Sequence, residues 1–172
     1  RGEGAAVIIL KPLSRALADG DHIYALIRGT AVNQDGRTAG ISMPSQTSQE
    51  ANIAAALRLA DIAPESIQYV ETHGTGTSVG DPIEASAIGA VYGKARDSEN
   101  RCVIGSIKSN IGHLESAAGI TGLIKTALCL QNRQIPKSLH FENPNPQIDF
   151  DDLRLQVAQR LEPWPETKEQ PA

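Results

Sequence analysis

The chain has 172 residues, enough for one domain or a large piece of one, and 40% of them are hydrophobic, so a packed core can form. The net charge is −4 and no stretch gathers lysine and arginine, which argues against nucleic acid or an anionic membrane as a partner. Cys102 and Cys129 lack metal-ligand spacing and are too few for a disulfide framework. With no signal-peptide pattern and no membrane-length apolar run in the sequence, we expect a cytoplasmic protein.

Apolar runs predict two strands in the first third of the chain. GEGAAVIILK (2–11) and HIYALIRGTAV (22–32) are continuous apolar stretches, and the polar LSRALADGD (13–21) predicts a short connection between them. The turn-rich NQDGRTAG (33–40) closes this unit. Thr47 and Glu50 then have the form of a capping box, which predicts a helix that ends before Pro64.

The rest of the chain alternates between strand and helix patterns. Strands are predicted at IQYVET (67–72) and RCVIGS (101–106), each followed by a helix: one with Asp81 at the N-cap and its end near Gly93, the other at 113–131. This order predicts an α/β layer with parallel strands. FENPNPQIDF (141–150) is a proline-rich surface stretch, and EPWPETKEQPA (162–172) is polar enough for a tail.

Two histidines follow the two predicted inner strands, at the point where each strand ends. His73 lies in HGTGTSVG and His113 in SNIGHLES, both turns rich in glycine or polar residues. Because ligands bind at the carboxyl ends of strands in open α/β sheets, we expect both histidines at one edge. A ligand site and a histidine simply hydrogen-bonded in a turn both fit this pattern.

Other interpretations of the same residues are weaker or structural. The glycine spacing does not match a phosphate-binding loop, and a metal held by both histidines with Asp81 or Glu84 has no recognised ligand spacing. Asp81 and Glu84 also fit the cap and third position of their own helix, with Pro82 at its first position. Lys108 can likewise be interpreted as an ordinary lysine exposed on the surface.

The motifs in combination are more specific than any of them alone. HGTGTSVGDPIE followed by GSIKSNIGHLESAAG resembles the C-terminal half of a β-ketoacyl synthase, the thiolase-like condensing domain of polyketide and fatty-acid synthases. GEGAAVIILK, AVNQDGRTAGIS and IPKSLHFENPNPQIDF agree in order, and NQDG with DPIE is most similar to type I polyketide synthases.

The resemblance implies a fold and a division of the chain. The fold is the thiolase-like α/β fold, a mixed sheet covered by helices, of which this chain is an incomplete C-terminal half. Residues 1–31 would be the end of the N-terminal ketosynthase half, residues 32–150 the C-terminal half, and residues 151–172 a partial terminal segment.

The resemblance also implies a reaction and the residues that perform it. Such enzymes are acyltransferases that join an acyl thioester to malonyl-carrier protein by decarboxylative Claisen condensation. His73 and His113 would be the catalytic pair, each neutral with Nε2 protonated, donating to the malonyl thioester oxygen. Thr75 and Thr77 match the contacts to phosphopantetheine, and Lys108 with Glu84 matches a supporting buried ion pair.

The implied partners follow from that reaction. They are an acyl carrier protein that brings the phosphopantetheine, acyl and malonyl thioesters, the N-terminal ketosynthase half, and a second copy in a homodimer. No metal or directly bound cofactor is implied.

Two family features are missing: the nucleophilic cysteine of a Thr-Ala-Cys-Ser-Ser stretch, and a Gly-rich segment that ends near Asn-Ala-His. We therefore expect a fragment that is inactive alone. A non-condensing ketosynthase that binds acyl-carrier protein, or a purely structural fragment, are the alternatives.

Overall fold

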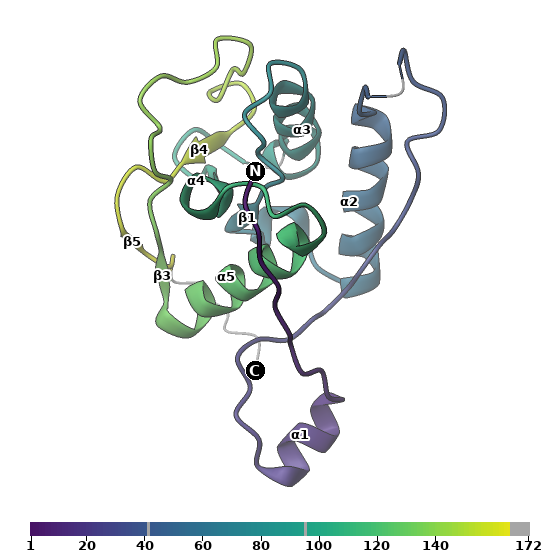
Figure 1. The fold of residues 1–172 in the computed structure, drawn as a ribbon, viewed down its shortest axis with the longest axis vertical. Helices are drawn as coiled ribbons and strands as arrows, with labels where there is room; N and C mark the ends of the chain where they lie inside the picture. The colour runs from purple at the N-terminus through teal and green to yellow at the C-terminus, as the bar shows by residue number, and fades with distance from the viewer. Residues whose placement is uncertain (41, 95, 166–172) are drawn as a thin grey trace.

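A computed structural model describes residues 1–40, 42–94 and 96–165 (Figure 1). Helices and strands alternate through the middle of the chain. The helices are α1 (Leu13–Asp19), α2 (Gln46–Ala60), η1 (Pro64–Ser66), α3 (Gly80–Ile88), η2 (Gly89–Gly93), α4 (Lys108–Ile111), η3 (Glu115–Ala117) and α5 (Ala118–Asn132). The strands are β1 (Tyr69–Glu71), β2 (Cys102–Gly105), β3 (Gln134–Ile135), β4 (Leu155–Val157) and β5 (Glu162–Pro163).

A three-stranded parallel sheet forms the centre, in the order β1-β2-β4. β1 and β2 pair in the register Tyr69 to Val103 and Glu71 to Gly105, so they end at the same edge. The predicted parallel strands at 67–72 and 101–106 are therefore confirmed. β3 and β5 make a separate antiparallel pair, so the strands described here do not join into one mixed sheet.

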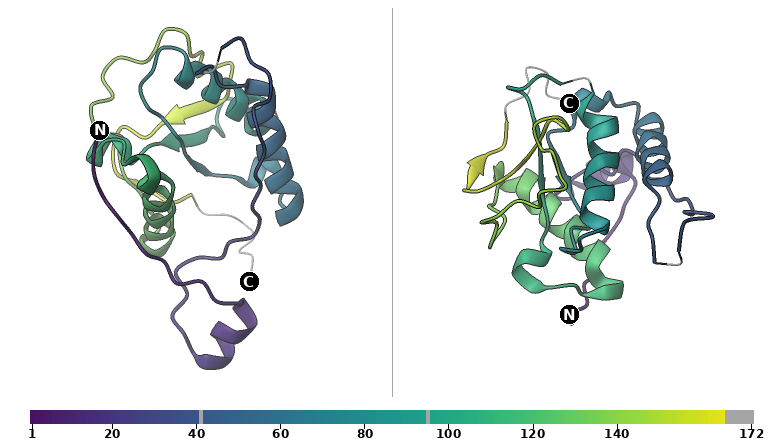
Figure 2. Two further views of the ribbon diagram at one scale, coloured as in Figure 1. Left: turned by 45° about the vertical axis from the view of Figure 1, so that its right-hand side comes forward. Right: turned by 90° about the horizontal axis from the view of Figure 1, so that it is seen from above.

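The two faces of the sheet carry different cores because side chains alternate along each strand. Cys102, Ile104 and Leu155 pack with Ala85 and Ile88 of α3 on one face, and α2 lies on the outer side of α3 (Figure 2). The other face carries a second core. Its buried residues are Tyr69, Val103, Ile135 and Ala158, with Trp164 packed against them.

The first third of the chain differs from its prediction. Residues 2–11 and 22–32 form no strand, and most of their large apolar side chains are open to solvent: Val7 is 89% exposed and Val32 is 92% exposed. The expected polar connection instead holds α1, which projects from one end of the molecule between two extended segments (Figure 1). A strand needs a hydrogen-bonded neighbour, and the described residues offer these two segments none.

The helix starts also differ in detail. α2 begins two residues before the predicted capping box, because Ser45 is its cap and accepts from the Ser48 backbone N–H at 3.2 Å. α3 begins at Gly80, so Asp81 lies in its first turn and is not the N-cap. Its continuation η2 ends at Gly93 as predicted. α5 begins only at Ala118, since His113 and Leu114 are not helical and η3 precedes α5.

The end of the described chain is more ordered than predicted. Leu155–Val157 form β4, which completes the central sheet, and Glu162–Pro163 form β5. Residues 166–172 of the predicted tail lie outside the described part of the chain. Within the described residues, none of the helices combines the length and apolar character that crossing a membrane requires.

Candidate active site

The loop after β1 is held by carboxylates of the helix that follows it. Both oxygens of Glu84 accept backbone N–H groups, from His73 at 2.6 Å and from Gly74 at 2.9 Å, and Asp81 accepts from Gly76 at 3.1 Å. Charge-assisted hydrogen bonds of this kind are the stronger ones in proteins. Asp81 and Glu84 therefore fix the loop that carries His73, which is more than the capping of their own helix that their spacing suggests.

The loop after β2 places His113 through the short helix α4. The Gly112 N–H closes α4 by donating to the Lys108 carbonyl at 3.0 Å, and His113 follows directly. The Glu115 backbone N–H donates to Nδ1 of His113 at 3.0 Å. Since Nδ1 accepts a hydrogen bond, a neutral His113 ring carries its proton on Nε2.

The two imidazoles lie together, as the placement of the two loops predicted. Their ring centroids are 5.1 Å apart with an interplanar angle of 83°. The parallel register of β1 and β2 brings both loops to one edge of the sheet, and the Thr72 N–H ties them by donating to the Gly105 carbonyl at 2.8 Å. This convergence forms a site with two imidazoles side by side.

The surroundings of His73 favour its neutral form. Its pKa is lowered from 6.5, first by partial burial and then by the positive charge of Lys108, with a smaller contribution in the same direction from His113. Glu84 and Asp81 act in the opposite direction. A ring with a lowered pKa is uncharged at neutral pH, which is the state expected of a neutral hydrogen-bond donor.

The direct ion pair expected between Lys108 and Glu84 does not form among the described residues. Both oxygens of Glu84 are occupied by the N–H groups of the His73 loop, and the half-buried Lys108 acts on His73 through its charge. The Lys108 charge and the Glu84 hydrogen bonds still meet around His73. Both residues thus adjoin the predicted site, in a different arrangement from the one expected.

The two threonines of the loop have different surroundings. The Thr77 hydroxyl oxygen accepts from the Gly80 N–H at 3.0 Å, so it helps to begin α3 and keeps its own proton for another partner. In the described part of the chain, no hydrogen bond involves the Thr75 hydroxyl, which is half-buried. Both hydroxyls retain capacity to bind a polar ligand.

The metal alternative lacks a ligand set. Nowhere in residues 1–40, 42–94 and 96–165 do three His, Cys, Asp or Glu side chains gather closely enough to hold a metal ion. Both oxygens of Glu84 and one oxygen of Asp81, the third ligands considered, are already hydrogen-bonded to the loop backbone.

The two cysteines lie in the core, where they are poorly suited to act as nucleophiles. Cys102 is 0% exposed and Cys129 is 5% exposed, and both are free thiols. Burial raises the pKa of Cys102 to about 11 and raises that of Cys129 in the same direction. Thiols of this kind are poor nucleophiles at neutral pH.

Sequence reasoning missed a buried ion pair beneath the histidine loops. Lys125 of α5 contacts Glu71 of β1 at 2.7 Å, and each side chain is only 13% exposed. The sequence held a signal for it, because Glu71 ends an apolar strand and Lys125 interrupts the apolar run of GLIKTALCL.

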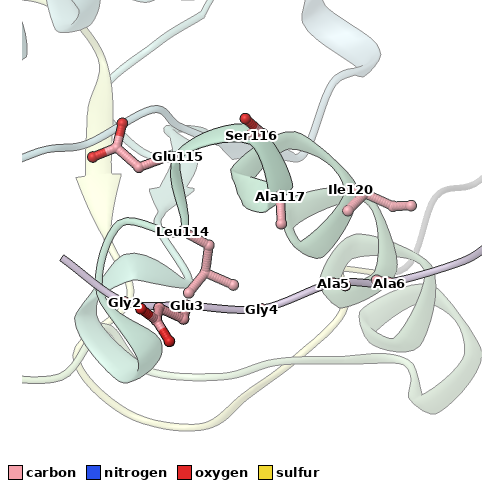
Figure 3. Close-up of a pocket in the computed structure, with 10 residues that line it drawn as sticks. All are labelled: Gly2, Glu3, Gly4, Ala5, Ala6, Leu114, Glu115, Ser116, Ala117 and Ile120. Atoms are coloured by element: carbon pink, nitrogen blue, oxygen red, sulfur yellow. The ribbon is translucent and has the colours of Figure 1, made fainter.

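A cavity of about 620 Å³ adjoins the His113 turn (Figure 3). One wall is the extended segment Gly2–Ala6 and the other runs from Leu114 to Ile120. The Gly2 N–H donates to the His113 carbonyl at 3.0 Å, which fixes that wall against the histidine turn. Figure 3 shows the Leu114 side chain pointing toward the Gly2–Gly4 stretch and Glu115 pointing away from it.

Comparison with known proteins identifies the class to which this chain belongs. The family model for the β-ketoacyl synthase C-terminal domain matches residues 24–142. The chain is 51% identical over 167 residues to one component of the phenolphthiocerol/phthiocerol polyketide synthase of Mycobacterium tuberculosis, covering 97% of this chain and 9% of that protein. It is 50% identical over 171 residues to a highly reducing polyketide synthase of Aspergillus terreus, covering 99% and 6%.

Solved structures agree with this assignment. The ketosynthase from module 6 of the bacillaene synthase of Bacillus subtilis 168 superposes with a TM-score of 0.86 at 44% identity, over 92% of this chain and 28% of that one. This chain therefore belongs to the β-ketoacyl synthase family and has part of the thiolase-like fold of polyketide synthase ketosynthase domains. It spans less than a tenth of the length of the curated relatives named here.

Proposed function

We propose that this chain supplies the decarboxylating side of a ketosynthase active site, which performs decarboxylative Claisen condensation in polyketide chain extension. The observation that carries the proposal is the pairing of His73 and His113, with ring centroids 5.1 Å apart. The hydrogen bond that His113 Nδ1 accepts leaves its Nε2 as the donor. In this role the complete domain is an acyltransferase.

The chemistry requires a site that stabilises negative charge on an oxygen. When the bond between the malonyl carboxyl carbon and the α-carbon breaks, carbon dioxide leaves and the electron pair becomes an enolate on the thioester. Two N–H donors aimed at the thioester oxygen stabilise the transition state, in which this charge develops, more than they stabilise the ground state. This difference lowers the barrier. Partial burial, followed by the Lys108 charge, supports this by lowering the pKa of His73 and so favouring its neutral form.

Condensation then consumes the enolate. The α-carbon attacks the acyl carbonyl held on a cysteine, a carbon–carbon bond forms, and the carbon–sulfur bond breaks to release the cysteine thiolate. That cysteine would come from the N-terminal ketosynthase half, because Cys102 and Cys129 are buried. The same half would cover the apolar side chains that residues 7–32 expose.

The remaining partners are assigned by the same chemistry. Thr75 and Thr77 would hold the phosphopantetheine amides of an acyl carrier protein, which presents malonyl and acyl thioesters. Residues 1–31, 32–150 and 151–172 would be the end of the N-terminal half, the C-terminal half and a partial terminal segment. The complete domain would be a homodimer in the cytoplasm.

The test separates two half-reactions in the complete ketosynthase. His73→Ala and His113→Ala should each lower carbon dioxide release from malonyl-carrier protein by on the order of a hundredfold or more, the usual effect of losing one such donor. Acyl transfer to the cysteine should change by only a few fold. His22→Ala is a matched control, because the His22 ring contacts Gln131 at 3.2 Å and lies outside this site.

Two results would contradict the proposal. One is equal loss of both half-reactions in the His73 and His113 variants, which would make the histidines structural. The other is a parent that binds acyl-carrier protein and holds acyl groups but releases no carbon dioxide, which is the behaviour of a non-condensing ketosynthase.

A further inference from the structure

A buried network links the two histidine loops from below. Glu71 is the last residue of β1, two residues before His73. Its Oε2 accepts from the Tyr69 hydroxyl at 2.5 Å and contacts Nζ of Lys125 at 2.7 Å. Lys125 also donates to the Tyr69 hydroxyl at 2.6 Å. One oxygen of Glu71 is thus held by two groups, which fixes the orientation of the carboxylate.

The second oxygen of Glu71 reaches the other loop. Oε1 accepts the backbone N–H of Ile107 at 2.5 Å. Ile107 is the N-cap of α4, and the four residues of that helix are followed only by Gly112 before His113. A single carboxylate therefore fixes the strand that leads to His73 and the helix start that leads to His113.

The surroundings of Glu71 allow this arrangement only because α5 approaches closely. A Cβ at Gly122 would lie 3.1 Å from Cγ of Glu71, so any larger residue at that position would press on the Glu71 side chain. Gly122 and Lys125 are three residues apart on α5 and so face the same strand. α5 thus provides the space for the Glu71 side chain at Gly122 and the counter-charge for its carboxylate at Lys125.

We propose that Glu71, held in place by Lys125, is a positioning residue that sets the separation of the two catalytic imidazoles by anchoring α4. This inference rests on the proposed function, since it assigns the network to the decarboxylation step. Misplacing a reacting group by about 1 Å costs on the order of a hundredfold in rate. Loss of the Ile107 anchor should therefore affect decarboxylation specifically.

Two double variants of the complete ketosynthase isolate the anchor. Glu71→Gln/Lys125→Met removes both charges and keeps an amide oxygen that accepts the Ile107 N–H. Glu71→Leu/Lys125→Met also removes both charges but leaves that N–H without an acceptor. Ile107→Pro removes that N–H together with the isoleucine side chain, keeps the ion pair, and fits the Ile107 φ of −62°.

The predicted outcome is a split between these variants. The Gln/Met pair should release carbon dioxide within a few fold of the parent rate. The Leu/Met pair and Ile107→Pro should lose on the order of a hundredfold in kcat, with KM for the malonyl thioester and the rate of acyl loading nearly unchanged. Arg96→Met is the control, because Arg96 is also buried but binds carbonyls at the opposite ends of the strands, including that of Glu65 at 2.9 Å. It should keep kcat per folded enzyme.

The inference is overturned if the Leu/Met and Gln/Met pairs release carbon dioxide at the same rate, or if both half-reactions fall by the same factor. Crystal structures of both pairs provide a second readout, independent of activity. The Leu/Met pair should move the ring centroids from the 5.1 Å separation of the parent, and an unchanged separation overturns the inference. A parent that releases no carbon dioxide would refute the proposed function, and the ring separation would still decide whether Glu71 positions the histidines.

Discussion

At the scale of single residues, His73 is controlled by charges of both signs that act from two loops. Lys108 lies on the α4 side and disfavours a protonated ring, whereas Glu84 and Asp81 on α3 favour one. Partial burial is the largest cause and the Lys108 charge adds to it, so the net result is a lowered His73 pKa. The same Glu84 that opposes Lys108 electrostatically holds the His73 backbone, so charge and geometry are set by the same few groups.

The charges around His73 predict that two variants shift the pKa of this histidine in opposite directions. Lys108→Gln removes a cause that lowers the pKa of His73, so this pKa should rise toward 6.5. Glu84→Gln removes a cause that raises it, so the pKa should fall further. NMR titration of the His73 ring measures both. A shift of the two variants in the same direction would contradict the assigned electrostatics.

At the scale of elements, the site depends on how closely the two loops pack. Gly74 has φ +47°, and a Cβ there would lie 2.7 Å from the Thr72 hydroxyl oxygen and 2.9 Å from Cβ of Ser106. The first contact is within the His73 loop and the second is with the loop after β2. The glycine thus permits both the left-handed turn and the approach of the two loops.

We predict that Gly74→Ala lowers the free energy of unfolding by about 1–3 kcal/mol, because it combines left-handed strain with a steric clash. Gly119→Ala is the matched control. Gly119 lies in the first turn of α5, and a Cβ there meets nothing within 4 Å. It should leave stability unchanged or raise it by up to about 1 kcal/mol. Urea denaturation compares the two variants, and equal stabilities would refute the role assigned to Gly74.

At the scale of the whole molecule, a buried parallel sheet is joined to a first segment that packs poorly on it. The exposed apolar residues of the first 32 positions include Val7 at 89%, Ile9 at 93% and Val32 at 92%. The relatives are much longer than this chain, since it covers 28% of the bacillaene ketosynthase structure. Both imidazoles of the site lie in this chain, whereas the two cysteines of the chain, Cys102 and Cys129, lie in the core.

The chain by itself should form no acyl-enzyme. With an acyl thioester, mass spectrometry should find Cys102 and Cys129 unmodified, because burial raises the pKa of both thiols. After unfolding, both should react rapidly with iodoacetamide, which confirms that they are intact. Stoichiometric acylation of either cysteine in the folded chain would overturn the assignment of the nucleophile to another part of the enzyme.

The sequence predicted the central strands and the convergence of the histidines because those features follow from local pattern and from the rule on strand ends. The sequence could not predict the conformation of residues 2–11 and 22–32. Their apolar pattern indicates a strand whether or not a pairing partner is present. The Lys108–Glu84 pair was expected from the family resemblance, but backbone N–H groups occupy Glu84. Glu71 and Lys125 each stand out in the sequence as a charge in an apolar run, but their pairing depends on how α5 packs on β1, which that pattern does not specify.

The most direct test of the central claim is a crystal structure of the complete ketosynthase with a non-decarboxylating malonyl thioester analogue. We predict that the thioester oxygen lies about 2.7–3.1 Å from Nε2 of both His73 and His113, the distance at which N–H donors stabilise a developing oxyanion. Binding of that oxygen by other groups, with the two imidazoles facing away from it, would contradict the account.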